Sequence, residues 1–334
     1  MVQAFVPYAT AASFRALVAD CLEDSGYRTG DAVEETGAQR SRAARTVPVL
    51  DVSPSSTASA LTWYERRLPG GVTTAVIVEL DGRWDLPLFR HLSAISGGFV
   101  VVIEGTRTLA RRGLAVFYAG RTIEAIGDDF VHAGIDIPGR RDVGGHDVFE
   151  LFTEYFWEIA GGTPHELRWD DETRVHTLTL ERSPESFHPY ALDLTREPRL
   201  SRAAFGHTDE RTFRRVVRPV VGGDAGHLGW RWLPATTPSS VPYVALQRDG
   251  DLGDALIMRL ARALDGYAIG FEFGAQPGEF TWLLIDPDRE AQRGRDRGAK
   301  PFIGRWTQFT VALGEKAGLV SWPCNEAGRS LLAQ

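Results

Sequence analysis

The stretch VIVELDGRWDLPLFRHLSAISGGFVVVIE, residues 76–104, has a counterpart 168 residues later in VALQRDGDLGDALIMRLARALDGYAIGFE, residues 244–272. The two align without a gap, so that Asp-Gly falls on Asp-Gly and each stretch ends in a glutamate after an apolar run. Residues 114–117 and 282–285 continue the match at the same offset. Because self-similarity at a fixed offset is typical of repeated architectures, the sequence favours an internal duplication.

Each copy predicts the order β-α-β-β. A short β-branched run is followed by an Asp-Gly turn, then by leucines with helical spacing, a glycine, and two more strand-like runs. The copies cover residues 76–120 and 244–288 of two halves, 1–167 and 168–334. We therefore expect an α+β fold made of two pseudo-symmetric β-α-β-β halves, with mostly antiparallel sheets and helices on one face.

The flanking segments predict further elements. Apolar periodicity indicates helices and alternation indicates a strand, whereas polar or charged composition indicates loops. The expected elements are an N-terminal helix at 10–25, a mobile surface loop at 28–60 interrupted by a short strand at 47–52, an acidic helix at 146–160, a strand at 173–181, a basic helix at 211–218 that Pro219 ends, and an exposed charged loop at 286–300.

Composition limits the class of protein. The chain has 334 residues, 43% of them hydrophobic, which argues against wholesale disorder. Its longest strong apolar run, residues 99–103, is far shorter than the roughly 18 residues of a membrane helix. Two cysteines cannot form a disulfide framework, and the N-terminus has no signal-peptide pattern. We expect a cytoplasmic protein with no membrane partner; the sequence does not indicate an oligomeric state.

The negative charge is unevenly distributed along the chain. Residues 1–167 contain 15 basic and 22 acidic residues, whereas residues 168–334 contain 22 of each. The formal net charge of −7 therefore belongs to the first half. Of the 37 basic residues, 35 are arginine, which codon bias or an arginine-selected recognition surface would explain.

No catalytic or cofactor motif is present in the sequence. Phosphate-binding loops, dinucleotide fingerprints, nucleophile elbows and zinc-protease signatures are all absent, so we expect no cofactor and no metal. The cluster of Asp249, Asp251 and Asp254 lacks EF-hand spacing and is better explained by a turn and a helix cap. His132 and His146 have carboxylates nearby in the sequence but match no ligand spacing, and their role stays open.

Glu104 and Glu272 are the catalytic candidates in this sequence. They are the ionisable residues retained near the end of the same strand in both copies. The second of these strands carries large residues on one face and small residues on the other, which predicts packing on both sides. Two carboxylates at such strand ends could share acid–base chemistry in a cleft between the halves, and a salt bridge at a strand end is the simpler alternative.

Two helices carry charged stripes of opposite sign. Acidic residues follow one side of the helix at 146–160, and no basic residue occurs between residues 142 and 166. Basic residues follow one side of the helix at 211–218. Two solvated faces are the simpler explanation, with binding of a partner or an anion as the alternative. The stripes consist of Asp147, Glu150, Glu154 and Glu158, and of Arg211, Arg214, Arg215 and Arg218.

The sequence thus favours a non-catalytic intracellular protein-interaction module. An inhibitor or immunity-type protein would bind a basic partner through its acidic first half, with fast and salt-sensitive association. The alternative is an enzyme or small-molecule binder with a pocket between the halves, acting on an anionic ligand. A nucleic-acid binder using Arg214, Arg215 and residues 293–300 is least favoured, because the overall charge is negative.

Overall fold

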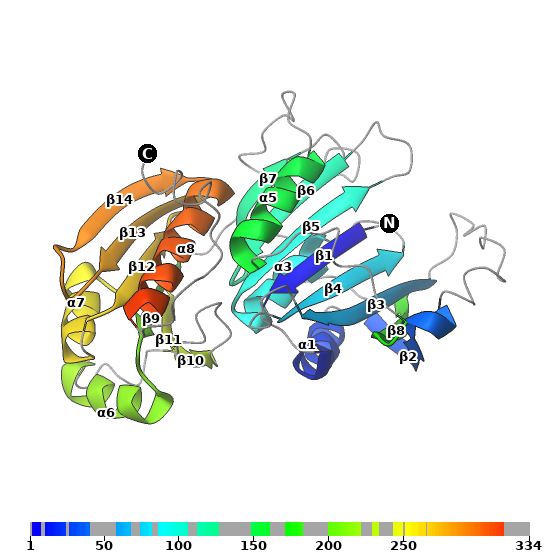
Figure 1. Cartoon of the computed structure of the whole chain (residues 1–334), viewed down its shortest axis with the longest axis horizontal. Helices are drawn as coiled ribbons and strands as arrows, with labels where there is room; N and C mark the ends of the chain where they lie inside the picture. The colour runs from blue at the N-terminus through cyan, green and yellow to red at the C-terminus, as the bar shows by residue number, and fades with distance from the viewer. Residues whose placement is uncertain are drawn as a thin grey trace. The chain divides into compact units, whose positions relative to one another are not determined.

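The described residues form two antiparallel sheets, one in each of two compact units, Met1–Arg196 and Glu197–Gln334 (Figure 1). The computed structural model describes residues 2–7, 11–24, 27–40, 58–67, 74–81, 86–105, 112–126, 148–160, 171–182, 200–221, 229–233, 243–249, 251–264 and 266–316. No helix within these ranges is long and apolar enough to cross a membrane.

The first unit contains an eight-stranded sheet in the order β2-β8-β3-β4-β1-β5-β6-β7. Its elements in chain order are β1 (Val2–Pro7), α1 (Ala11–Asp24), β2 (Tyr27–Thr36), β3 (Ala58–Arg67), β4 (Thr74–Asp81), α3 (Leu86–Ser96), β5 (Phe99–Gly105), β6 (Arg112–Tyr118), β7 (Arg121–Ile126), α5 (Val148–Ala160) and β8 (Arg174–Arg182). Helices α1 and α3 pack on one face through buried residues such as Phe14 and Leu92. Helix α5 covers the other face, where the Phe5 ring lies 4.4 Å from that of Phe156.

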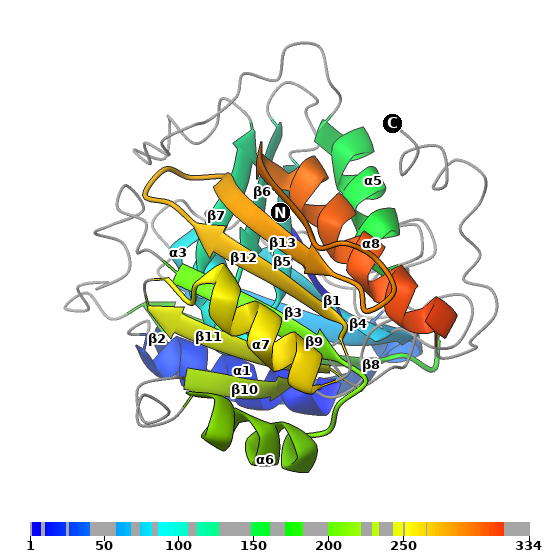
Figure 2. The same cartoon turned by 90° about the vertical axis from the view of Figure 1, so that its left-hand side faces the viewer.

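The second unit contains a six-stranded sheet in the order β10-β11-β9-β12-β13-β14. Its elements are β9 (Leu200–Gly206), α6 (Glu210–Val221), β10 (Gly229–Leu233), β11 (Tyr243–Asp249), α7 (Asp254–Ala263), β12 (Ala268–Phe273), β13 (Glu279–Ile285), β14 (Gln292–Arg297) and α8 (Ala299–Lys316). Helices α6 and α7 lie side by side on one face, with Phe213 and Leu260 in their shared core (Figure 2). Helix α8 packs on the other face, where the rings of Phe271 and Phe302 are 4.6 Å apart.

Both sheets follow the chain in the same way. Without the extra strands β2 and β8, the first sheet has the order β3-β4-β1-β5-β6-β7, and the second has the order β10-β11-β9-β12-β13-β14. The two orders are the same when the six strands of each set are numbered along the chain, so that β1 corresponds to β9 and β3 corresponds to β10. The register agrees as well, since Val102 lies opposite Ala115 and Gly270 lies opposite Leu283, both 168 residues later. The helices also occupy corresponding positions along the chain. Helices α1, α3 and α5 follow β1, β4 and β7, and helices α6, α7 and α8 follow the matching strands β9, β11 and β14.

Several sequence predictions are confirmed. The expected β-α-β-β order is present as β4-α3-β5-β6 and as β11-α7-β12-β13, and the fold is α+β with antiparallel sheets. The helices expected at 10–25 and 146–160 are α1 and α5, and the strand expected at 173–181 is β8. Strand β12 is packed on both sides, because its small-residue face meets α7 and its aromatic face meets α8.

Other predictions are wrong. Helices cover both faces of each sheet rather than one, because strands such as β5 and β12 are apolar on both sides. Residues 27–36 form β2 and residues 292–297 form β14, although both segments were expected to be loops. Both are edge strands with many exposed side chains, and therefore lack the apolar alternation that identifies a strand. Pro219 does not end α6, which continues to Val221.

The unit boundary also differs from the division into halves. The compact units divide between Arg196 and Glu197, whereas the sequence halves divide between residues 167 and 168. The difference arises because β8 pairs with β2 and β3, so this strand belongs to the first sheet. The short strand expected at 47–52 lies outside the described residues.

Candidate functional site

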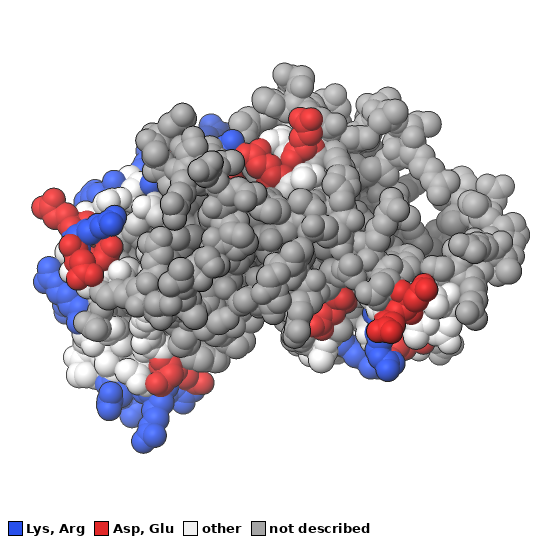
Figure 3. Space-filling view, in the orientation of Figure 1, with Lys and Arg blue, Asp and Glu red and all other residues white. Residues whose placement is uncertain are grey.

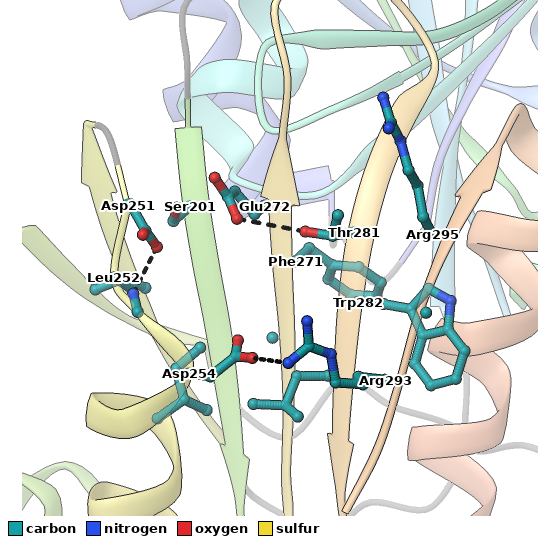
Figure 4. Close-up of a pocket in the computed structure, with 15 residues that line it drawn as sticks. Ser201, Asp251, Leu252, Asp254, Phe271, Glu272, Thr281, Trp282, Arg293 and Arg295 are labelled. Carbon is teal, nitrogen blue, oxygen red and sulfur yellow. Dashed lines mark hydrogen bonds and ion pairs between the residues drawn. The ribbon is translucent and has the colours of Figure 1, made fainter.

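A cavity of about 360 Å³ lies in the second unit, between the start of α7 and strands β9, β12, β13 and β14 (Figure 4). This volume is near the lower end of the range for ligand sites, and suits one side chain or a small molecule. The lining comprises Ser201, Asp251, Leu252, Gly253, Asp254, Ile257, Gly270, Phe271, Glu272, Thr281, Trp282, Leu283, Arg293, Gly294 and Arg295.

The walls of the cavity include three buried apolar side chains, Leu252, Ile257 and Leu283. Gly270 allows the first turns of α7 to come close to the sheet, since a Cβ atom at this position would lie 2.7 Å from Cδ1 of Ile257. The close approach of helix and sheet gives the cavity a firm apolar wall.

A row of polar side chains crosses the sheet at the rim. In the antiparallel ladders Ser201 lies opposite Glu272, Glu272 opposite Thr281, and Thr281 opposite Arg295. Directly opposed residues point to the same face of a sheet, so the four side chains lie side by side (Figure 4). The Thr281 hydroxyl donates a hydrogen bond to Oε2 of Glu272 over 3.4 Å. Arg248, opposite Ser201 on β11, extends the row.

The turn before α7 forms the opposite side of the cavity. The Gly253 N–H donates to Oδ1 of Asp251 over 2.6 Å, and Gly253 has a φ of 73°. Asp254, the first residue of α7, forms an ion pair with Arg293, whose Nη1 lies 3.6 Å from its Oδ2. Asp251 therefore stabilises the turn, and Asp254 connects the start of α7 to β14 through its ion pair with Arg293. The described residues contain no group of three metal-ligating side chains.

Among the described residues, two carboxylates of the lining, those of Asp251 and Glu272, have no cationic partner. Nη2 of Arg295 lies 2.8 Å from Oε2 of Glu279, and Arg293 is paired with Asp254. Among the described residues, no lysine, arginine or histidine forms an ion pair with Glu272, whose side chain is exposed at the rim. With three carboxylates and two guanidinium groups, the lining has a net negative charge.

A cluster on the α8 face supports strand β14 beneath the cavity. The Trp282 indole N–H donates to Oδ2 of Asp296 over 2.8 Å, and the same oxygen lies 3.3 Å from Nε of Arg305. The Arg305 guanidinium carbon lies 3.9 Å from the centre of the Trp282 ring. These contacts tie β13, β14 and α8 together, and so hold the backbone that carries Arg293 and Arg295.

Of the two glutamates proposed from the sequence, Glu272 lies at the rim of this cavity. Glu104 lies in β5 of the first unit, and its side chain is outside the described residues. The prediction that the two form a pair in a cleft between the halves stays a prediction.

The basic stripe lies on the outer face of α6. Arg211, Arg214, Arg215 and Arg218 are all exposed, while Phe213 and Val217 are buried. Figure 3 shows basic side chains gathered over this helix. Nη2 of Arg214 lies 2.6 Å from Oε1 of Glu210, one turn earlier.

The acidic stripe on α5 is less accessible than the sequence suggests. Glu150 is exposed, whereas Glu154 and Glu158 are partly buried. Asp147, His132 and His146 lie outside the described residues.

Sequence reasoning missed Ser201 and Thr281, and it assigned Arg293 and Arg295 to an exposed charged loop instead of a cavity. Their convergence depends on the register between four strands, which no local pattern encodes. One signal was present, since alternate arginines at 293, 295 and 297 are typical of a strand with one charged face.

Comparisons of the chain with protein-family models, with curated proteins and with solved structures found no match.

Proposed function

We propose that this protein is a non-catalytic interaction module that captures a partner protein, with the cavity of the second unit as its binding site. The observation that carries the proposal is the combination of buried apolar walls with an exposed polar row, a composition typical of recognition sites. An inhibitor or immunity-type protein in the cytoplasm would act in this way, by covering a surface of its target.

The chemistry of the lining favours binding over catalysis. It provides hydroxyls, carboxylates and guanidinium groups, but its described residues include no histidine, cysteine or lysine that could act as a base near neutral pH or as an activated nucleophile. This is why the alternative, an enzyme acting on an anionic ligand, ranks second.

Charge separation supports capture of a basic partner. Residues 1–196 contain 19 basic and 28 acidic residues and residues 197–334 contain 18 and 16, so the formal charges of the units are −9 and +2. An acidic unit would attract a basic protein over long range and speed its association at low salt. The acidic helix α5, with Glu150 exposed, would contribute to this attraction.

The proposal is tested by photo-crosslinking in the native host. The exposed Thr281 is replaced by p-benzoylphenylalanine, and the exposed Asp288, which does not line the cavity, serves as the matched control position. We expect one discrete protein adduct from position 281 and none from position 288, both identified by mass spectrometry. Equal adducts from both positions, or none from position 281, would contradict the proposal.

We also infer that the two units arose by internal duplication. The shared strand order, the equal positions of the helices and the common 168-residue register support this inference. A crystal structure in which the matched strands of the two units fail to superpose would contradict it.

A further inference from the structure

We propose that the cavity receives a cationic side chain on an aliphatic stem, a lysine or arginine of the partner protein. The inference rests on the proposed function, since it names the chemistry that the cavity would recognise.

The charge of the cavity selects a cation. Arg293 and Arg295 each lie beside a carboxylate, at 3.6 Å and 2.8 Å. The Glu272 carboxylate receives one long hydrogen bond of 3.4 Å from the Thr281 hydroxyl. A carboxylate can accept several hydrogen bonds, so Glu272 retains capacity for an ammonium or guanidinium donor.

The shape of the cavity suits the stem of such a side chain. Leu252, Ile257 and Leu283 present apolar surface, and all three are at most 6% exposed. Lysine and arginine place their methylene groups along apolar surface and keep the charged end near polar groups. In this cavity the stem would lie along the apolar wall and the charged end would reach Glu272 at the rim.

An anion is the competing ligand. It would have to draw Arg293 from Asp254 or Arg295 from Glu279, and it would approach the carboxylate of Glu272. Both effects oppose anion binding, whereas a cation leaves the existing ion pairs in place.

The test is an amide-shift titration of the full chain by NMR. The probes are Nα-acetyl-lysine methylamide and its norleucine analogue, which has a methyl group in place of the aminomethyl end of the lysine. We expect saturable shifts at Gly253, Gly270 and Gly294, which line the cavity, with the lysine probe binding about tenfold more tightly than the norleucine probe.

Two variants make the test specific to the carboxylate. Glu272→Gln keeps the shape of the side chain and removes its charge, and we expect it to weaken lysine-probe binding by about tenfold. Glu290→Gln removes a charge from an exposed residue that does not line the cavity, and should leave the affinity unchanged. Both substitutions are at exposed positions, and unchanged melting temperatures would confirm that the fold is intact.

The inference is overturned if Glu272→Gln binds the lysine probe as well as the unmodified chain does, or if inorganic phosphate binds more tightly than the lysine probe. A partner crosslinked at position 281, together with no lysine-probe binding, would refute the cation and leave the proposed function standing. Lysine-probe binding with no crosslinked partner would support the cation and refute capture of a protein, pointing to a small amine as the ligand.

Discussion

At the scale of single residues, two close approaches between helix and sheet depend on glycine. Gly270 admits Ile257 of α7, and Gly206 admits Leu313 of α8 on the opposite face of the second sheet. A Cβ atom at position 206 would lie 2.0 Å from Cδ2 of Leu313, which is fully buried. Because the packed core leaves Leu313 little room to move, any larger side chain at 206 must displace the Leu313 side chain or the helix that carries it.

Gly206→Ala is therefore expected to destabilise the chain by about 1–3 kcal/mol, the usual cost of overpacking a core. Gly274→Ala is the matched control, because no atom lies within 4 Å of its added Cβ and its φ is not positive. The urea midpoints of both variants and the unmodified chain give the measurement. Equal midpoints for the two variants would show that Leu313 moves aside without cost.

At the scale of elements, helix α6 is held at its start by Asp209. Hydrogen bonds from the Thr212 backbone N–H at 2.7 Å, and secondarily from its hydroxyl, hold the pKa of Asp209 below its ordinary value. A lowered native pKa means that the folded state favours the charged carboxylate. Its contribution to stability is therefore complete above the unfolded pKa of about 4, and is lost as the pH falls through the native pKa.

Asp209→Ala should consequently be less stable than the unmodified chain at pH 7, and the difference should shrink at pH values below about 4. Asp209→Asn is the control, because asparagine also caps a helix but carries no charge that titrates. Its stability at pH 7 should be closer to that of the unmodified chain. Urea midpoints at pH 7, 4 and 3 make the comparison, and a difference for Asp209→Ala that stays constant with pH would contradict the expectation.

The elements that could be predicted from sequence are those with an apolar face. The helices α1 and α5 and the strands of both β-α-β-β stretches have clear periodicity, because one or both of their faces are buried. Strands β2 and β14 were not predicted, since they lie at sheet edges and lack apolar alternation, and the alternate arginines of β14 are its one sequence signal. Glu272 was found because a glutamate stands at the matching position of the other repeat. Ser201 and Thr281 were not found, because only the register between the strands places them beside Glu272.

At the scale of the whole molecule, the described residues include two large hydrophobic clusters, one in each unit, with no residue in common. Each cluster lies between one sheet and a pair of helices from the same unit, and a second helix layer covers the opposite face of that sheet. Such a unit has the parts of an independently folding domain. The position at which the first unit ends depends on β8, because this strand lies between β2 and β3 in the first sheet.

Two fragments test this boundary. The fragment 1–196 retains β8, whereas the fragment 1–167 lacks it and leaves β2 without the strand that joins it to the sheet. An isolated strand with exposed side chains and no partner cannot stay ordered, and the edge of β3 is then left unpaired. We expect 1–196 to unfold cooperatively, and 1–167 to have a lower melting temperature and fast amide exchange over residues 27–36. If the two fragments melt together with equal exchange over residues 27–36, β8 contributes nothing to the fold of this unit, and the boundary near residue 167 indicated by the sequence repeat would be the better one.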